Sequence, residues 1–345
     1  MADKYNILFF GASYGSLLGA KVALAGHSAH LICLPEEAEL INNEGAIIRL
    51  PVRGLDQPVE LNTKEMPGAV TAGGPEEANP SDYDLIVLAM QEPQYRVPVV
   101  KDLLSKVGAS GKPCMSIMNM PPLSFIRRIP GVDAATIRDA YTDPTVWDNV
   151  DPSRITLCSP DPQAFRPPEE KCNVLQVGLP TNFKSARFEG DADTNILNQI
   201  EQDIQNIRFD AGGNSVELPV KLRVHDSVFV PLAKWCMLLA GNYRCIQAEE
   251  MRPIREAVHS DLGSSESVYN WVADLCVKLG ADPNDLVPFE KYANAALSLK
   301  NPSSAARALA AGAPYIERVD KLVQALGASQ GMHSADVDSL SLIHI

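Results

Sequence analysis

The sequence lacks the features of membrane proteins and of nucleic-acid-binding proteins. No apolar run approaches the length of a membrane span, about 18 residues, and the run Ile7–Phe10 is too short for a signal peptide. Lys and Arg form no stripe, and the net charge is −13 with a pI of about 4.9, which disfavours a nucleic-acid partner. An anionic substrate would have to bind through a few cations focused in a cleft.

The cysteine pattern excludes a further group of sites. The seven cysteines are scattered, their number is odd, and no C-x-x-C pair occurs. This pattern favours reduced, mostly buried thiols in a cytoplasmic protein over disulfides or a zinc site. No other metal-ligand spacing appears, so we expect no metal.

The stretch Asn6–Leu34 organises the rest of the interpretation. Its apolar run Ile7–Phe10 predicts a strand buried on both faces, and a helix follows with apolar residues at helical spacing up to Gly26. His30–Leu34 predicts a second buried strand. Strand, glycine turn, helix and strand within about 30 residues form the βαβ unit that binds a dinucleotide.

The turn between the first strand and the helix differs from the usual G-x-G-x-x-G order. It is one residue shorter, and we predict that the pyrophosphate binds to its six residues, Gly11, Ala12, Ser13, Tyr14, Gly15 and Ser16. Glycines let the backbone approach the phosphates, and the N–H groups and positive dipole end of the helix receive their charge. A βαβ unit that packs and binds nothing is the alternative.

The residues after the second strand normally meet the adenosine ribose. Leu34 and Pro35 occupy that place, Glu36 and Glu37 follow, and no cation is present to pair with a 2′-phosphate. This favours NAD over NADP, with Leu34 and Glu36 as cofactor-binding residues. Alternatively, the two glutamates only favour the N-terminus of the next helix, predicted at Pro35–Gly45.

Two later strands also end beside polar residues. Asp84–Ala89 predicts a buried parallel strand, and Pro113–Met118 predicts another. Ligands of open α/β sheets bind at the carboxyl ends of the strands, so we predict cofactor contacts directly after them, at Met90, Gln91, Gln94 and Asn119. Asn119 either bridges cofactor and substrate or is a turn residue beside two prolines.

The pattern of the 345-residue chain predicts two domains. Further strands are predicted at the sheet edge, Ala46–Leu50 and Val59–Leu61, and as extensions of the sheet, Ile155–Cys158, Val174–Val177 and Arg187–Glu189. A helix is predicted at Thr194–Ile207, and from Val228 onward only helices, at Val228–Gln247, Glu266–Lys278, Phe289–Leu299, Ala306–Ala311 and Tyr315–Leu326. The fold class is therefore α/β, an N-terminal Rossmann-type doubly wound sheet followed by an all-helical domain, with a cleft between them. We place the dinucleotide-binding domain at 1–215, the helical substrate and catalytic domain at 216–335, and a tail without functional weight at 336–345.

The first of these C-terminal helices carries Lys234 within an otherwise apolar run. An ionised lysine is costly to bury without a partner, so it either reaches solvent or lies poised in a cleft. Asn242 lies about two turns further on, close to the same helix face. A lysine and an amide on one face suit the holding and protonation of a carbonyl oxygen, and partial burial would lower the lysine pKa.

These features resemble the ketopantoate reductase (2-dehydropantoate 2-reductase) family. The resemblance is carried by Gly15–Leu18 with Ala25–His27, by Lys234 and Asn242, and by a Ser-Ser segment followed by Gly and Pro, at Ser303, Ser304, Gly312 and Pro314. It implies a helical domain like the C-terminal domain of 6-phosphogluconate dehydrogenase, NADPH as the hydride donor, Lys234 as general acid, and a homodimer. It also implies substrate contacts at Asn119, Lys234, Leu238, Asn242, Ser303 and Ser304.

Several site positions depart from the family pattern. The first amide after the lysine falls at Leu238, and the late supporting acid aligns at Ile316, with Glu317 one position away. The Asp near that acid falls at Ala308, a cofactor-side Lys is replaced by Gln91, and the Arg after the second strand is missing. Ketopantoate itself is therefore not the expected substrate.

The sequence thus predicts an NAD(P)-dependent reductase of a small 2-keto acid with an apolar substituent, acting on the CH–OH group in the reverse direction. Lys234, Asn242 and Glu317 are its predicted catalytic residues. Two alternatives stay open: an opine- or imine-forming dehydrogenase that catalyses reductive amination, and a non-catalytic dinucleotide-sensing protein. The expected partners are a keto or imino acid and a second copy of the chain, with no nucleic acid and no membrane.

Overall fold

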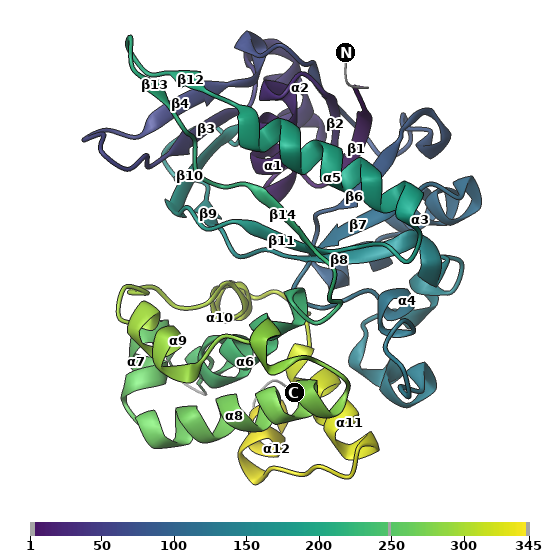
Figure 1. Ribbon diagram of the computed structural model, residues 1–345, viewed down its shortest axis with the longest axis vertical. Coiled ribbons are helices and arrows are strands. Elements are labelled where there is room, and N and C mark those ends of the chain that lie inside the picture. Colours follow the sequence, from purple (N-terminus) through teal and green to yellow (C-terminus); the bar gives the residue numbers. More distant parts are fainter. Residues whose placement is uncertain (1–3, 248–249, 343–345) are drawn as a thin grey trace. The chain divides into compact units, whose positions relative to one another are not determined.

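The computed structural model describes residues 4–247 and 250–342 (Figure 1). Its backbone contacts divide the chain into two compact units. Unit 1 comprises residues 4–90, 97–118 and 149–226, and unit 2 comprises 91–96, 119–148, 227–247 and 250–342. Two short segments from the N-terminal half of the chain, 91–96 and 119–148, therefore belong to the unit that contains the C-terminal helices.

Unit 1 is built on a sheet that has eight strands in the described residues, in the order β14-β11-β8-β7-β6-β1-β2-β5. The strands are β1 (Asn6–Phe10), β2 (Ser28–Ile32), β5 (Val70–Gly73), β6 (Leu85–Leu88), β7 (Cys114–Ile117), β8 (Ile155–Ser159), β11 (Phe183–Ala186) and β14 (Leu222–His225). All neighbours are parallel except β11 and β8. The predicted Rossmann-type sheet is confirmed.

Helices cover both faces of this sheet. Helices α1 (Tyr14–Leu24) and α5 (Asp191–Asn206) pack against each other, and their core includes Ile7 and Phe9 of β1, whereas the alternate residues Leu8 and Phe10 point to the other face. The crossover through α1 leads from β1 to β2, and the crossover through α3 (Pro98–Ser110) leads from β6 to β7, in the opposite direction along the sheet. Because parallel crossovers are right-handed, α3 lies on that other face. The sheet is therefore doubly wound (Figure 1).

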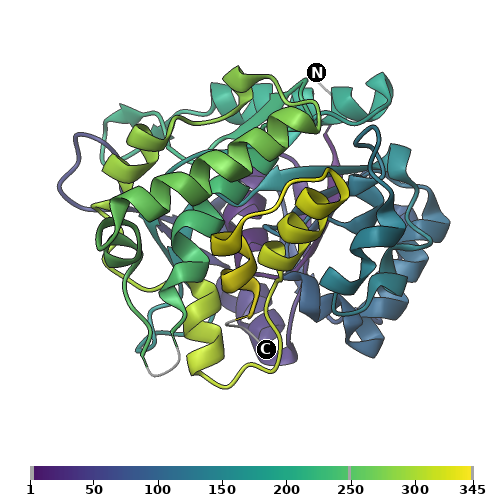
Figure 2. The same ribbon diagram turned by 90° about the horizontal axis from the view of Figure 1, so that it is seen from below.

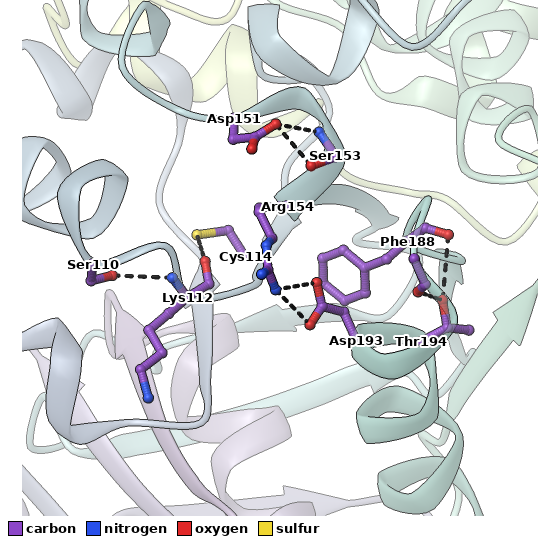
Figure 3. Close-up of polar contacts among 10 residues, drawn as sticks. Ser110, Lys112, Cys114, Asp151, Ser153, Arg154, Phe188, Asp193 and Thr194 are labelled. Atoms are coloured by element: carbon purple, nitrogen blue, oxygen red, sulfur yellow. Dashed lines mark hydrogen bonds and ion pairs between the residues drawn. The ribbon is translucent and has the colours of Figure 1, made fainter.

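The start of α5 shows how local chemistry sets a helix boundary in unit 1. Arg154 donates to both carboxylate oxygens of Asp193, at 3.0 and 2.9 Å, in the first turn of the helix (Figure 3). The hydroxyl of Thr194 donates to the carbonyl of Gly190 at 2.8 Å. An acidic side chain in the first turn also complements the helix dipole, so the helix begins earlier than the predicted Thr194.

A second sheet corrects three strand predictions. It contains β3 (Ile47–Leu50), β4 (Val59–Asn62), β9 (Gln163–Phe165) and β10 (Val174–Leu179), in the order β4-β3-β10-β9. Ala46–Leu50 and Val59–Leu61 thus do not edge the main sheet, and Val174–Val177 does not extend it, because β10 pairs with β3. The strand predicted at Arg187–Glu189 is instead β11, which ends at Ala186. The remaining strands, β12 (Phe209–Asp210) and β13 (Ser215–Val216), form a hairpin, and α2 (Pro35–Glu44) follows β2 as predicted.

Unit 2 is mainly helical in the described residues, as predicted. Its helices are α4 (Leu123–Ile126), α6 (Lys234–Met237), α7 (Ile254–His259), α8 (Leu262–Lys278), α9 (Phe289–Ala296), α10 (Ser304–Ala310), α11 (Val319–Ser329) and α12 (Ala335–Leu342). Helix α12 contains most of the predicted tail and contacts α8 and α11, among the yellow and green helices of Figure 2. Its residues Val337 and Leu340, three positions apart, are both buried. Residues 343–345 lie outside the described residues.

The prediction of one regular helix over Val228–Gln247 is wrong. The segment is a succession of a 3₁₀ turn (Pro231–Ala233), α6, a π-helical turn (Leu238–Asn242) and another 3₁₀ turn (Tyr243–Cys245). Apolar periodicity cannot reveal such changes, because each helix type buries one face. π-helical turns of this kind occur frequently at functional sites.

No helix in the described ranges is both long enough and apolar enough to cross a membrane. The seven cysteines are all free thiols. Trp147 and Trp235 lie in the core of unit 2, as expected for large apolar side chains.

A buried lysine on α1 is an unexpected feature of unit 1. Lys21 is almost fully buried, and its ammonium donates to the carbonyl of Pro219 at 3.0 Å. Burial, followed by the nearby charge of Lys221, lowers the pKa of Lys21 to about 7. Val220, the residue after Pro219, has a φ of 61°, which is rare for a β-branched side chain.

This burial predicts a pH-dependent contribution to stability. Because the folded-state pKa lies below the unfolded value of 10.5, the unfolded chain binds more protons between pH 7 and 10.5, and stability rises with pH there. The free energy of unfolding of wild type should therefore rise with pH relative to that of Lys21→Met, by up to about 1.4 kcal/mol per pH unit. Urea midpoints at pH 7, 8 and 9 measure this gain. The matched control is Lys171→Met, an exposed lysine that pairs with Glu44. Parallel pH profiles for wild type and Lys21→Met would contradict the assignment.

Candidate functional site

The glycine turn after β1 requires glycine at its first position. Gly11 has a φ of 94°, and its N–H donates to the carbonyl of Ile32 at 2.9 Å, which ties the turn to the end of β2. A Cβ on Gly11 would lie 3.0 Å from the carbonyl oxygen of Ala89 and 3.0 Å from Cγ of Met90. The turn therefore lies tightly against the end of β6, and Met90 is half-buried at this contact.

The start of α1 has no side-chain cap. Ser13 is the N-cap residue and is exposed, but no side chain caps the helix and no acidic residue lies in its first turn. The hydroxyl of Ser16 donates to the carbonyl of Ala12 at 2.5 Å, and that of Tyr14 to the carbonyl of Pro162 at 2.9 Å. Uncapped N–H groups at a helix start fit an anion such as pyrophosphate.

Gly15 provides the close contact between α1 and the sheet that this motif needs. A Cβ added to Gly15 would lie 3.4 Å from Cβ of Phe9 on β1 and 3.7 Å from a methyl group of Leu31 on β2. The absence of a side chain thus lets the helix lie directly on the strands, which is the role of the third glycine in dinucleotide-binding units. The residues present at this turn fit a dinucleotide.

The predicted ribose contacts lie at the start of α2. Leu34 is the N-cap residue of that helix, and its side chain is 74% exposed. Glu36 is also exposed, whereas Glu37 is buried. An exposed apolar side chain directly after β2 offers a surface to an adenosine.

Unit 2 contains a pocket in which most predicted substrate residues meet. Its lining consists of Gln91, Asn119, Leu238, Asn242, Tyr243, Ser303, Ser304, Ala305, Ile316 and Glu317. The cavity is small, about 20 Å³, and is partly open to solvent. Its lining comes from segments more than 200 positions apart in the sequence, which the fold of unit 2 brings together.

Glu317 is the central acid of this pocket. Its carboxylate accepts hydrogen bonds from Nδ2 of Asn119 at 3.1 Å and from the backbone N–H groups of Met120 and Glu92, both at 3.4 Å. Burial raises the pKa of Glu317, while these hydrogen bonds and the charge of Lys234 lower it. Glu317 and its neighbour Ile316 both line the pocket, the first as an acid and the second as an apolar side chain.

Glu92 is a buried acid that the sequence interpretation passed over. Its carboxylate accepts from the N–H of Thr142 at 3.0 Å and from the hydroxyl of Thr142 at 2.8 Å. Burial raises the pKa of Glu92 to about 7; the bonds from Thr142 lower it and the charge of Glu317 raises it. The predicted contact residues Gln91 and Gln94 flank this acid, and its place directly after a buried strand was the available signal.

Asn119 carries an unsatisfied acceptor. The amide nitrogen of Asn119 donates to the carboxylate of Glu317. An ionised carboxylate can only accept hydrogen bonds, so Oδ1 of Asn119 finds no donor there. This Oδ1 is buried and has no hydrogen-bond partner in the described part of the chain. A buried acceptor of this kind is costly unless a ligand or water donates to it.

The other predicted substrate residues are held by backbone contacts. The hydroxyl of Ser303 donates to the carbonyl of Asn242 at 2.7 Å and accepts from the N–H of Ala306 at 3.2 Å, which caps α10. Tyr243, not predicted from the sequence, donates its hydroxyl to the backbone carbonyl of Glu317 and accepts from the N–H of Val319 at 3.0 Å. The bonds of Ser303 and Tyr243 thus join the end of the π-helical turn to the start of α10 and to the start of α11.

Two predicted residues, Lys234 and Gln94, do not line the pocket. Lys234 is half-buried and acts on Glu317 through its charge, but it is not among the pocket-lining residues. The π-helical turn between Lys234 and Asn242 changes the angle between them from that of a regular α-helix. Gln94 does not line the pocket; its Oε1 accepts from the N–H of Gln91 at 2.9 Å.

Unit 1 is thus a doubly wound sheet of the Rossmann type, and unit 2 is a mainly helical unit with a polar pocket. No protein-family model and no curated protein sequence matches the chain. Solved structures do match. They include a candidate ketopantoate reductase from Ralstonia solanacearum MolK2, with 12% identity, a TM-score of 0.69, and coverage of 98% of this chain and 96% of that chain.

Two further matches are described without qualification as this enzyme. The 2-dehydropantoate 2-reductase from Methylococcus capsulatus has 12% identity, a TM-score of 0.63, and coverage of 98% and 94%. The dimeric ketopantoate reductase from Staphylococcus aureus has 9% identity, a TM-score of 0.58, and coverage of 98% and 96%. The chain therefore has the fold of the ketopantoate reductases over nearly its whole length, as the sequence resemblance implied.

The buried Glu92 predicts a second pH effect on stability. Its folded-state pKa of about 7 exceeds the ordinary 4.5, so the folded protein binds more protons between these values and stability falls as pH rises from 4.5 to 7. In Glu92→Gln the free energy of unfolding should fall less steeply over this range, by up to about 1.4 kcal/mol per pH unit. Urea midpoints at pH 5, 6 and 7 measure it, with Glu290→Gln, on α9 in the same unit, as control. The assignment is wrong if the two variants show the same slope.

Proposed function

We propose that this protein is an NAD(P)-dependent oxidoreductase that reduces a small 2-keto acid. The supporting observation is the pocket of unit 2, where Asn119, Asn242, Ser303 and Glu317 meet near the charge of Lys234. The uncapped start of α1 in unit 1 supports a dinucleotide cofactor. The ketopantoate reductases that share this fold support the reaction class.

In this proposal the bound nicotinamide supplies a hydride to the carbonyl carbon of the substrate. Lys234 donates a proton from Nζ to the carbonyl oxygen, which avoids the formation of an unprotonated alkoxide. The charge of Lys234 in turn favours the ionised form of Glu317. Asn242 and Asn119 orient the substrate by hydrogen bonds, and Ser304 contributes a hydroxyl at the mouth of the pocket.

The apolar residues of the pocket indicate the polarity of the substrate side chain. Leu238 and Ile316 are nearly fully buried and line the pocket. A leucine cannot replace the hydrogen bonds of an amide at this position, and burying a polar substituent against it would be costly. We therefore propose a 2-keto acid with an apolar side chain in place of ketopantoate.

A second reaction, reductive amination of a 2-keto acid by an amine, is favoured by one observation. The unpaired Oδ1 of Asn119 and the carboxylate of Glu317 are both acceptors in the same pocket. Such a pair suits a substrate N–H donor, which would satisfy the buried amide oxygen. The product would then be a secondary amine, formed with loss of water and oxidation of the dinucleotide.

One assay separates these functions. NADH and NADPH are titrated by fluorescence, and 2-keto acids are then screened with and without amines while absorbance of the reduced nicotinamide is followed. Oxidation with keto acids alone supports the reductase, and oxidation that requires an amine supports reductive amination. Tight nucleotide binding without turnover on any substrate would identify a dinucleotide-sensing protein, and no binding would overturn the proposal.

Substitution of Lys234 tests its role as general acid. We expect Lys234→Ala to lower kcat by about 10²- to 10⁴-fold, the usual contribution of acid catalysis, with nucleotide affinity unchanged. The control Lys291→Ala, on α9 of the same unit, should retain kcat. Normal turnover by Lys234→Ala would remove this residue from the mechanism. Recovery of activity at lower pH or with added small amines would support proton donation.

We also propose that the protein is a cytoplasmic homodimer. Seven free thiols suit a reducing compartment. One structure with this fold is described as dimeric. Sedimentation velocity over a range of protein concentrations gives the mass of the particle and tests the dimer directly.

A further inference from the structure

A second cavity of unit 2 lies among helices α8, α11 and α12 (Figure 1). Trp271 of α8, Gln324 of α11 and Asp338 of α12 line it, together with the loop 332–334. Its volume is about 350 Å³, against about 20 Å³ for the pocket of Glu317, and among the described residues the two share no lining residue. Sites for small molecules usually measure about 300–1,000 Å³, so this cavity has the size of a binding site.

A glycine inside α11 makes room for the indole ring of Trp271. A Cβ added to Gly327 would lie 2.5 Å from Cη2 and 2.9 Å from Cζ2 of that ring. The end of the ring therefore rests directly on the backbone of α11. Glycine in a helix interior is destabilising relative to alanine, so α11 loses some stability at this position and Trp271 gains a fixed place at the cavity.

The loop between α11 and α12 is fixed by its own hydrogen bonds. Gly331 has a φ of 69°, and its N–H donates to the carbonyl of Ala328 at 3.0 Å, while the N–H of Met332 donates to the carbonyl of Gly327 at 2.8 Å. This is the Schellman pattern that ends a helix at a glycine. The hydroxyl of Ser334 accepts from a backbone N–H in the first turn of α12 at 3.4 Å. The wall of the cavity is therefore preformed, and a ligand would not have to order it.

Asp338 gives the cavity a negative charge. Its Oδ1 accepts from Nε2 of Gln324 at 2.7 Å, and within the described ranges its Oδ2 accepts no hydrogen bond and no lysine or arginine pairs with it. Lys278, at the end of α8, donates instead to the carbonyl of Gln330 at 2.6 Å and does not line the cavity. Each oxygen of a carboxylate can accept hydrogen bonds, so Oδ2 of Asp338 is available to a donor on a ligand.

The lining distinguishes between classes of ligand. An anion is disfavoured, because the described lining contains a carboxylate and neither lysine nor arginine. A metal ion is disfavoured too, since no group of three His, Cys, Asp or Glu residues in the described part of the chain could hold one. A wholly apolar ligand would take water from Asp338 and Gln324 without replacing it. A carboxylate and an indole in one cavity suit an organic cation, which donates to the first and packs on the second.

We propose that this cavity binds a small organic cation, an ammonium group carried on an apolar or aromatic body. Asp338 accepts a hydrogen bond from the ammonium group, and Trp271 contacts the body of the ligand. This site is separate from the pocket of Glu317, and its ligand is neither the substrate nor the cofactor of the proposed function.

Calorimetry with three probes of similar shape tests this inference. Phenethylamine carries the positive charge, 2-phenylethanol is its neutral counterpart, and 3-phenylpropionate is its anionic counterpart. Wild type should bind phenethylamine about tenfold more tightly than 2-phenylethanol, because hydrogen bonds between charged groups are the stronger ones, and should bind 3-phenylpropionate most weakly.

Fluorescence shows where the amine binds. Trp147 and Trp235 are buried in the core, whereas Trp271 is half-buried at the cavity. We therefore expect phenethylamine to change the tryptophan emission of wild type, and we expect this change to be absent in Trp271→Phe. An unchanged response in Trp271→Phe would place the amine elsewhere and contradict the inference.

Substitutions separate the charge from the shape of the cavity. Asp338→Asn keeps an oxygen that accepts from Gln324 and removes the charge. It should weaken phenethylamine by about tenfold and change 2-phenylethanol less than about threefold. Added salt should weaken phenethylamine in wild type but not in Asp338→Asn. The matched control is Asp336→Asn, an exposed acid of the same helix outside the lining, which should match wild type.

Three results would overturn the inference and leave the proposed function standing. The first is equal affinity of wild type for the amine and the alcohol, or no binding of any probe. The second is a preference for the amine that survives in Asp338→Asn with an unchanged urea midpoint. The third is a loss of amine affinity in Glu317→Gln instead, which would place the amine in the other pocket. The order of the three affinities in wild type needs no variant, so it decides the matter even if Asp338→Asn does not fold.

Discussion

The cost of burying a carboxylate organises the pocket of unit 2. Glu317 is buried, so its oxygens must accept hydrogen bonds, and the donors are the amide of Asn119 and the backbone of Met120 and Glu92. One carboxylate therefore joins three segments that are far apart in the sequence. The arrangement also explains why 91–96 and 119–148 belong to unit 2, since their hydrogen-bonding groups are needed there.

The same principle applies in unit 1. Glu37 is buried near the end of β2, and its partner is the more exposed Arg166. In both places a buried acid gains its stability from a partner supplied by a distant segment. In the pocket of unit 2 the group left over, Oδ1 of Asn119, is the one that can meet a ligand.

Local patterns predicted the parts of the fold that local physics determines. The strand, glycine turn and helix of residues 6–24 were predicted closely, because buried runs, glycines with positive φ and helical spacing are properties of neighbouring residues. The failures have specific causes. Val174–Val177 has the apolar pattern of a strand, but a pattern does not say which strand is its neighbour. The π-helical turn at Leu238–Asn242 buries the same side chains as a regular helix and leaves no trace in the periodicity.

The sequence by itself determined the Rossmann-type unit, the helical second half and the residue types of a reductase pocket, because strand burial, turn chemistry and helix spacing act over a few residues. Only the tertiary structure decided which acid lies in the pocket, Glu317 beside Asn119 and Glu92, and which cation stands at the end of β2. Those are contacts across 129 to 225 positions of chain. Partners at such separations are selected by how whole strands and helices pack, and no local pattern of side chains encodes that choice.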